Sequence, residues 1–361
     1  MNNKGYQSGI TIIEIMISLL IGAFLLGGIL EVFISSKQTY KMQNNLSRLQ
    51  ENGRFALILL TENIQAAGFM GCESKILINN LNNRDNFLYR FGFAIEGFES
   101  ISDSVWSPNL PLTPDNAKVI TFPFGGSDIF AIRKADDQSL TVISNANSKL
   151  TLESSVSTQN LQEAGYLTND PPCLIATVNN CKNAAVIQVT SVTKPDNTNA
   201  LLYHNTGGAC LPGNSSDQLG DSFDNQKFLI NKINTISYFV RFNSEKLQQR
   251  SLYRRVGLND PEELVSEIEN MQVSYGLDTD IPFNGANYYT TADKVTYTDW
   301  PKVVSIRISL LAVTLEDNLT PQPMPYTFNG ITTTTTSTPP VTDHKIRRVF
   351  TTTIAIRNRL P

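Results

Sequence analysis

The chain has 361 residues, a net charge of −4 and 41% hydrophobic residues, and only 17% of its residues are charged. This length allows one large domain or two smaller ones, and the acidic balance without a basic run argues against a nucleic-acid-binding protein. Few charged residues with abundant Asn, Ser and Thr are more typical of an exported β-rich protein than of a cytosolic helical enzyme.

An almost wholly apolar stretch runs from Ile10 to Leu30. As a helix it is about 30 Å long, enough to cross the hydrocarbon core of a bilayer. Its one charged residue is Glu14, and a carboxylate at membrane depth costs roughly 2.5–3.5 kcal/mol, which makes it a functional candidate. The alternative is a signal anchor with an acidic residue near the interface. No A-x-A-like cleavage site follows Leu30, so we expect the span to be retained.

Beyond Lys37 the apolar residues recur at steps of three and four, which predicts that the helix continues with one buried face. No proline occurs before Pro108 to end it at the membrane surface. We expect the helix to run to about Gly68, where glycine suits a helix end, and to pack on a folded domain. The predicted buried stripe comprises Met42, Leu46, Leu49, Gly53, Ala56, Leu60, Ile64 and Ala67.

From Gly71 onwards, short β-branched and aromatic segments alternate with turn-rich loops. The segments that predict strands are Val119–Phe122, Ile129–Arg133, Leu140–Ile143, Leu174–Val178, Val186–Val192, Ile233–Arg241, Met271–Leu277, Val303–Leu315 and Phe350–Asn358. Thr332 to Thr338 predicts an exposed loop between the last two strands. The predicted fold class is therefore α+β, with a long helix packed on one β-rich domain. Residues 79–200 as an inserted subdomain are the alternative.

Four cysteines, Cys72, Cys173, Cys181 and Cys210, follow the apolar stretch. An even number in an exported chain predicts disulfides, and four cysteines allow three pairings. The short loop from Cys173 to Cys181 makes that pair our preferred prediction. Cys72 would then join Cys210.

No constellation for catalysis occurs in the sequence. The two histidines, His204 and His344, belong to no H-E-x-x-H pattern, and no G-x-S-x-G elbow, P-loop or dinucleotide fingerprint occurs. Asp278 and Asp280 could contribute oxygen ligands for calcium, but a solvated turn is the simpler interpretation because no complete EF-hand loop surrounds them. We therefore predict a protein that is not an enzyme and that has no cofactor and no metal site.

The N-terminus resembles the class III signal of type IV pilins. A polar leader precedes Gly9, and Thr11 and Glu14 precede the uninterrupted apolar run. The resemblance implies that prepilin peptidase cuts between Gly9 and Ile10 and methylates Ile10, and that Glu14 serves subunit assembly. The family usually has Phe where this chain has Ile10. The implied division is a leader (1–9), a membrane and filament-core helix (10–34), its amphipathic continuation (35–70) and an extracytoplasmic β-rich domain (71–361).

Further stretches resemble the PilW family of minor pilins. They are Arg-Leu-Gln-Glu-Asn-Gly-Arg-Phe-Ala from Arg48, Ala-Gly-Phe-Met-Gly-Cys ending at Cys72, Ala-Ala-Val-Ile-Gln-Val-Thr from Ala184, and Tyr-Gly-Leu-Asp from Tyr275, followed by Trp-Pro-Lys-Val-Val-Ser-Ile-Arg. The resemblance implies a minor pilin that primes assembly of a type IV pilus, in a tip complex. The implied partners are other minor pilins, the major pilin, prepilin peptidase, the inner-membrane assembly machinery and a tip adhesin, with no nucleic acid.

The same resemblance implies where the protein resides. It would be a single-pass protein of the bacterial inner membrane with its C-terminal domain in the periplasm, and it would reach the pilus and the cell surface after assembly. Two alternatives stay open: a minor pseudopilin of a type II secretion system, and a bitopic extracytoplasmic binding protein with an uncleaved anchor. The spacing from Gly9 to Glu14 argues against the second.

Overall fold

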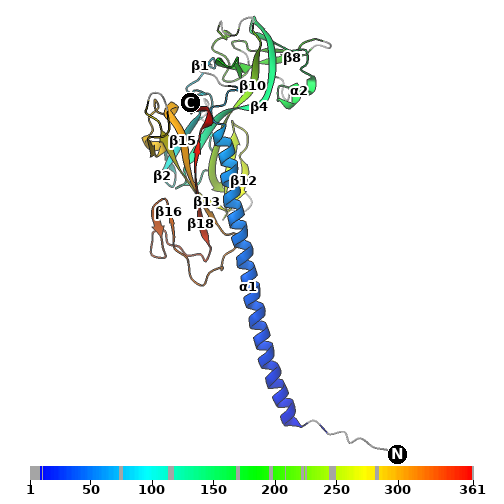
Figure 1. Ribbon diagram of the computed structural model, residues 1–361, viewed down its shortest axis with the longest axis vertical. Helices are drawn as coiled ribbons and strands as arrows, with labels where there is room; N and C mark the ends of the chain where they lie inside the picture. The colour runs from blue at the N-terminus through cyan, green and yellow to red at the C-terminus, as the bar shows by residue number, and fades with distance from the viewer. Residues whose placement is uncertain are drawn as a thin grey trace, which may run out of the picture.

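The computed structural model describes the chain except residues 1–8, 10, 73–75, 113–117, 168–170, 195–197, 208, 221–222, 224–225, 244–248, 281–283 and 360–361. A single helix, α1 (Ile12–Gln65), is 54 residues long. Its first half projects from the globular part as a stalk, and its second half lies along that part (Figure 1). The predicted α+β architecture, a long N-terminal helix followed by a β-rich domain, is confirmed.

Helix α1 ends three residues before Gly68. Residues 66–68 form a turn, and Gly68 has a φ of 78°, a left-handed conformation that favours glycine. The Gly68 amide then donates to the carbonyl of Arg133 at 2.8 Å, which ties the end of the helix to the β domain. Glycine therefore marks the turn beyond the helix, not its last residue.

The larger sheet has twelve strands. Eight follow one another in the order β1-β7-β6-β10-β4-β5-β9-β8, while β11 joins β10 to β12, and β2 joins β4 to β3. A short helix, α2 (Thr158–Glu163), lies between β5 and β6 in the chain. The strands are β1 (Ile76–Asn79), β2 (Ile95–Ser102), β3 (Val105–Ser107), β4 (Ile129–Ala146), β5 (Lys149–Leu152), β6 (Leu174–Asn179), β7 (Asn183–Val189), β8 (Ser191–Thr193), β9 (Leu201–Tyr203), β10 (Phe228–Phe242), β11 (Arg250–Val256) and β12 (Glu262–Ser266).

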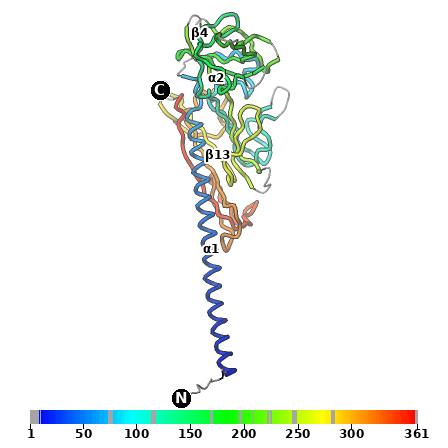
Figure 2. Tube along the Cα trace, turned by 90° about the vertical axis from the view of Figure 1, so that its right-hand side faces the viewer, coloured from blue at the N-terminus to red at the C-terminus, as the bar shows by residue number. Residues whose placement is uncertain are grey.

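The smaller sheet has four strands in the order β14-β13-β15-β18, and it packs against the second half of α1 (Figure 2). Its strands are β13 (Ile268–Leu277), β14 (Tyr288–Thr290), β15 (Val303–Val313) and β18 (Arg347–Ala355). Between β15 and β18 in the chain, β16 (Tyr326–Phe328) and β17 (Ile331–Thr333) form a hairpin. The remaining elements are the short 3₁₀ turns η2 (Ala292–Lys294), η3 (Trp300–Lys302) and η4 (Arg357–Arg359).

Strands β4 and β10 cross the whole domain and pair antiparallel, with one irregularity between Asn231 and Ile233. They link a core beneath α1, which includes Leu60 and Ile308, to a second core at the end farthest from the stalk, which includes Leu161 and Ile187. A third cluster surrounds Phe87. The far end is therefore a lobe on shared strands and not a separately connected domain.

Most predicted strands are confirmed, with differences in length. The two segments predicted at residues 129–133 and 140–143 are one strand, β4, because Lys134, Ala135 and Ser139 between them also pair with β10 on either side of the irregularity. The strand predicted at Val119–Phe122 is wrong. Phe122 has a φ of 54°, which no β-strand residue adopts. The predicted Thr-rich loop is mainly irregular, although its beginning belongs to β17.

The disulfides differ from the predicted pairing. Cys72 pairs with Cys181, and Cys173 pairs with Cys210, with Cα–Cα distances of 5.2 and 5.1 Å. The preferred pair was wrong because strand β6 lies between Cys173 and Cys181. Six residues at about 3.3 Å each hold the two cysteines at opposite ends of that strand.

Candidate functional site

The start of α1 carries the residues that the pilin resemblance singled out. Thr11 is the N-cap, and its hydroxyl accepts the amide of Glu14 at 3.2 Å. Glu14 lies in the first turn, where a negative charge is favoured by the helix dipole. Gly9 has no neighbour within 4 Å of the position that a Cβ would take. Ile10 and the leader residues 1–8 lie outside the described residues, so cleavage and methylation stay predictions.

The apolar half of α1 is uncovered. Its large apolar side chains between Ile12 and Ile34 are exposed, from 49% at Ile15 to 79% at Phe24. Soluble monomers rarely leave so large a contiguous apolar surface in water. By length and composition α1 could cross a membrane, and its most apolar part has no buried residue. This half of the helix therefore needs an apolar environment that the described part of the chain does not supply.

Glu14 has no ion-pair partner among the residues that the structure describes, and its side chain is exposed. A carboxylate on an otherwise apolar helix surface either stays near a polar interface or meets an opposite charge when the surface is covered. The geometry thus leaves Glu14 available for a group from another molecule.

The second half of α1 buries a narrow stripe. Its fully or nearly buried residues are Asn45, Leu49, Gly53, Ala56, Leu60 and Ile64. Met42, part of the predicted stripe, is 39% exposed because the helix emerges from the domain at this level. At Gly53 the helix and β18 are so close that a Cβ would overlap the ring of Phe350.

A polar cluster that the sequence analysis missed fixes the helix against the domain. Glu267, between β12 and β13, is 1% exposed and has a φ of 66°. The Arg48 guanidinium lies 2.7 Å from one of its carboxylate oxygens, and the Asn52 amide donates to the other at 3.0 Å. Both partners lie on α1. In the sequence, Arg48 and Asn52 lie on the polar side of the predicted buried stripe. Their position beside that stripe was the sequence feature that could have indicated a polar contact with the domain.

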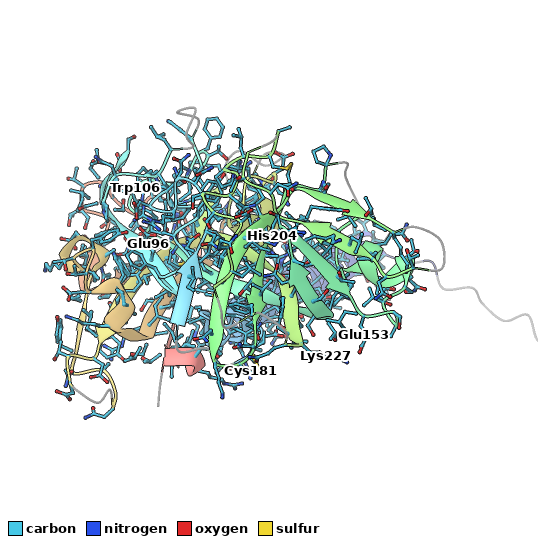
Figure 3. The ribbon with its side chains drawn as sticks, turned by 90° about the horizontal axis from the view of Figure 1, so that it is seen from above. Glu96, Trp106, Glu153, Cys181, His204 and Lys227 are labelled. Atoms are coloured by element: carbon cyan, nitrogen blue, oxygen red, sulfur yellow. A yellow bond between two sulfur atoms is a disulfide. The ribbon has the colours of Figure 1, made fainter. Side chains whose placement is uncertain are left out.

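The junction between the two sheets holds a pair of acidic residues. The carboxylate of Asp128 accepts the amide of Ser100 in β2 at 3.0 Å and the amide of Val273 in β13 at 2.9 Å. Burial, with the negative charge of Asp128, raises the pKa of Glu99 to about 8, and burial raises the pKa of Asp128 to about 6. Glu99 and Glu96 both belong to β2, and Figure 3 shows Glu96 well away from Glu153 and Lys227.

This pair predicts a loss of stability in mildly alkaline conditions. The folded pKa of Glu99 lies above its ordinary value of 4.5, so the folded chain holds a proton that the unfolded chain releases. The stabilisation is complete below about pH 4.5 and is lost as the pH rises through about 8. We expect the free energy of unfolding, from denaturant titrations of the full chain in detergent, to fall less between pH 7 and 9 in Glu99→Gln than in the unaltered protein.

Glu153→Gln is the control for this measurement. Glu153 lies at the surface with its side chain half-exposed, and its hydrogen bond from Lys227, at 2.7 Å, lowers its pKa. Its carboxyl group therefore does not titrate between pH 7 and 9. The free energy of unfolding of Glu153→Gln should change with pH as it does in the unaltered protein. If the free energy of unfolding falls equally between pH 7 and 9 in Glu99→Gln and in the unaltered protein, the buried pair does not have this role.

Asp278 organises a loop. Its carboxylate accepts the amides of Asp280 at 3.0 Å and of Asn284 and Gly285 at 2.6 Å each. These backbone donors use the oxygens that a calcium ion would need, and Asp280 accepts from Asn287. In the described part of the chain, no group of three or more His, Cys, Asp or Glu side chains is placed to hold a metal ion.

The two histidines lie in different surroundings. His204 is fully buried, and burial lowers its pKa to about 4. Nδ1 of His344 lies 2.7 Å from the carbonyl of Thr320 in the loop after β15. Among the residues that the structure describes, neither imidazole ring is hydrogen-bonded to a serine or cysteine side chain.

Comparison with known proteins connects this geometry to a family. The model for type IV pilus-assembly protein W matches residues 237–358, and the prokaryotic N-terminal methylation motif matches residues 4–30. A search of curated proteins finds no match. A solved type IV-like pilin from Thermus thermophilus is 12% identical, and the alignment covers 51% of this chain and 85% of that pilin. Its TM-score of 0.17 is too low to carry an argument about the fold.

The two family matches fall on the parts that the structure joins. The methylation motif covers the start of α1, and the PilW match runs from within β10 to η4, which includes the sheet on which α1 packs. The far lobe built on the first half of β10 lies outside both matches. The chain therefore matches the PilW family of type IV pilus-assembly proteins over residues 237–358 and the N-terminal methylation motif over residues 4–30.

Proposed function

We propose that this protein is a minor pilin that primes assembly of a type IV pilus and enters the filament with other minor pilins, in a complex at its tip. The observation that carries the proposal is the division of α1. One half is an exposed apolar helix whose first part lies within the methylation motif. The other half packs on the β domain. This combination suits a structural subunit that is anchored in a membrane before assembly.

The proposed mechanism is transfer of the apolar half of α1 from lipid to a bundle of helices. In the membrane the side chains from Ile12 to Ile34 face acyl chains. After extraction they need another apolar surface, since their exposure to water is unfavourable by about 25 cal/mol for each Å² of apolar area. Neighbouring subunits with similar helices provide that surface. The partners would be the other minor pilins and the major pilin, with prepilin peptidase and the inner-membrane assembly machinery acting earlier and a tip adhesin at the filament end.

Processing after Gly9 is the test of this function. We expect the native protein to begin at methylated Ile10, and intact-mass analysis of protein from cells with active prepilin peptidase measures this directly. Replacing Gly9 with valine should leave the leader attached, because a glycine precedes the cut in this class of signal. A native protein that still begins at Met1 would overturn the assignment.

Glu14 should serve assembly and not folding of the β domain. Cleavage would leave a positively charged amine on Ile10, and opposite charges in a low-dielectric bundle attract strongly, whereas either alone is costly to bury. We expect Glu14→Leu to be cleaved at Gly9 but to recover far less of the other minor pilins in pull-downs of the full-length protein. The pairing would also set the axial register between helices that could otherwise slide.

Glu31→Leu is the matched control for Glu14→Leu, since Glu31 lies on the same exposed helix just beyond the apolar stretch. Its variant should recover partners normally. If Glu14→Leu is processed, retains its partners and supports normal pilus numbers, Glu14 has no pairing role in this subunit.

A further inference from the structure

Strand β18 is the last strand of the smaller sheet, and one of its edges is open. It pairs with β15 over all nine residues without a register shift. The amide of Ile356 donates to the carbonyl of Val304, and the amide of Thr314 donates to the carbonyl of Ile346. These bonds fix the alternation of an antiparallel ladder. The even-numbered residues of β18 therefore direct their backbone groups to β15, and the odd-numbered residues direct theirs outwards.

The outward backbone groups belong to Val349, Thr351, Thr353 and Ala355, whose side chains are exposed. Among the described residues, no other strand pairs with this edge. Proteins usually protect such edges with lysine, proline, a bulge or a covering element. From residue 349 to 355 this strand has no lysine, proline or bulge, and its Thr, Val and Ile residues favour β structure.

A groove lies beside the open edge. It has a volume of about 400 Å³ and is lined by Leu57, Ile58, Thr61, Glu62 and Gln65 of α1 and by Thr352 of β18. Leu57 and Ile58, which is 62% exposed, give the groove an uncovered apolar part, next to the polar Thr61, Glu62 and Gln65. A strand added to β18 would place every second side chain in this groove, because side chains alternate between the two faces of a sheet.

A second copy in the same membrane does not fit this edge. Gly53 of α1 packs on Phe350, and the Asn358 side chain donates to the carbonyl of Ala67, so β18 and α1 run in the same direction. Two identical edges can pair only when the strands are antiparallel. Such a pair would also turn the two α1 helices in opposite directions. Subunits anchored in one membrane have parallel helices, which excludes this dimer.

We propose that the open edge of β18 and the adjacent groove bind an extended segment of a different protein, which adds to the sheet as a fifth strand. Main-chain hydrogen bonds to the odd-numbered residues supply the attachment, and the groove selects apolar side chains at alternate positions of the segment. The acidic side chain of Glu62 at the groove disfavours an acidic residue there. The bound segment spans seven to nine residues, roughly the length of β18.

Site-specific photo-crosslinking in piliated cells tests this proposal. Benzoylphenylalanine is placed at Val349 or at Ala355 of the full-length protein, and the crosslinked peptides are located by mass spectrometry. The two positions are six residues apart on one face of β18. We expect both adducts in one segment of one partner, about six residues apart, as pairing of two extended strands requires. Adducts in a helix or at unrelated positions, or no adduct in piliated cells, would overturn the proposal.

Two variants identify the contacts. Thr351→Pro removes one outward amide and leaves the ladder to β15 intact, and we expect the adduct yield to fall by up to about tenfold, as the loss of that hydrogen bond implies. Thr351→Val keeps that amide and should keep the yield. Ile58→Glu in the exposed groove tests the second contact without disturbing the core, with Ile58→Val as its control. An adduct that persists in both Thr351→Pro and Ile58→Glu would refute the proposed strand addition. Failure here leaves the N-terminal processing test of the pilin function unaffected.

Discussion

Replacing Gly53 with leucine should displace α1 from the smaller sheet. A Cβ at this position would overlap the ring of Phe350, which belongs to β18 and packs against the main core. Overpacking a site of this kind costs about 1–3 kcal/mol or more. Replacing a glycine in a helix interior by a better helix former gains only about 1 kcal/mol. We expect a lower unfolding temperature of the β domain, measured on the full chain in detergent by near-ultraviolet circular dichroism.

Other glycines of the same helix provide the control. Gly22 and Gly27 have no neighbour within 4 Å of a Cβ, so Gly27→Leu should leave the unfolding of the β domain unchanged. Phe350→Ala in the Gly53→Leu background should recover part of the loss, because the leucine then occupies the space of the ring and the two changes are coupled. Equal unfolding temperatures for Gly53→Leu and the unaltered chain would show that the helix is not fixed at this point.

Removing the disulfide between Cys72 and Cys181 should destabilise the protein more than removing the other. The two bridges have sequence separations of 109 and 37 residues. A larger closed loop restricts the unfolded chain more, and the chain-entropy relation gives about 4.8 kcal/mol for the first and about 3.8 kcal/mol for the second. Denaturant titrations of the two paired Cys→Ser variants should therefore differ by about 1 kcal/mol.

A second experiment checks which cysteines are paired. Non-reducing peptide mapping should find the peptide of Cys72 linked to that of Cys181, and the peptide of Cys173 linked to that of Cys210. Changing Cys72 and Cys181 together should leave the second bridge formed, whereas changing Cys72 and Cys173 would leave two cysteines without their native partners. A link between Cys173 and Cys181 in the native protein would contradict the structure.

Local patterns in the sequence predicted the helix and its two environments. The apolar run and the stripe from Leu49 to Ile64 depend on periodicity within one helix, and α1 contains both. The strands were also detected where their residues have high β propensity, as in β10, β13 and β15. Strands such as β11, with three arginines, were missed because their pairing partners compensate for unfavourable composition.

Contacts between distant residues could not be predicted in this way. Sequence separation favoured the pair Cys173 and Cys181, yet β6 keeps them apart and brings each to a cysteine of another segment. The buried Glu267 and its partners on α1 are more than 200 residues apart in sequence. Likewise, the polar residues between the two halves of β4 form a strand only because β10 pairs with both sides.

The sequence by itself determined that an apolar helix precedes a β-rich domain and that Glu14 is the one charged residue between Ile10 and Leu30. These properties follow from composition and from periods of two and 3.6 residues, which act over short stretches of chain. Only the tertiary structure decided the disulfide pairing, the close approach of Gly53 to Phe350 and the open edge of β18. Those features depend on which distant segments become neighbours, and that is set by the packing of the whole chain.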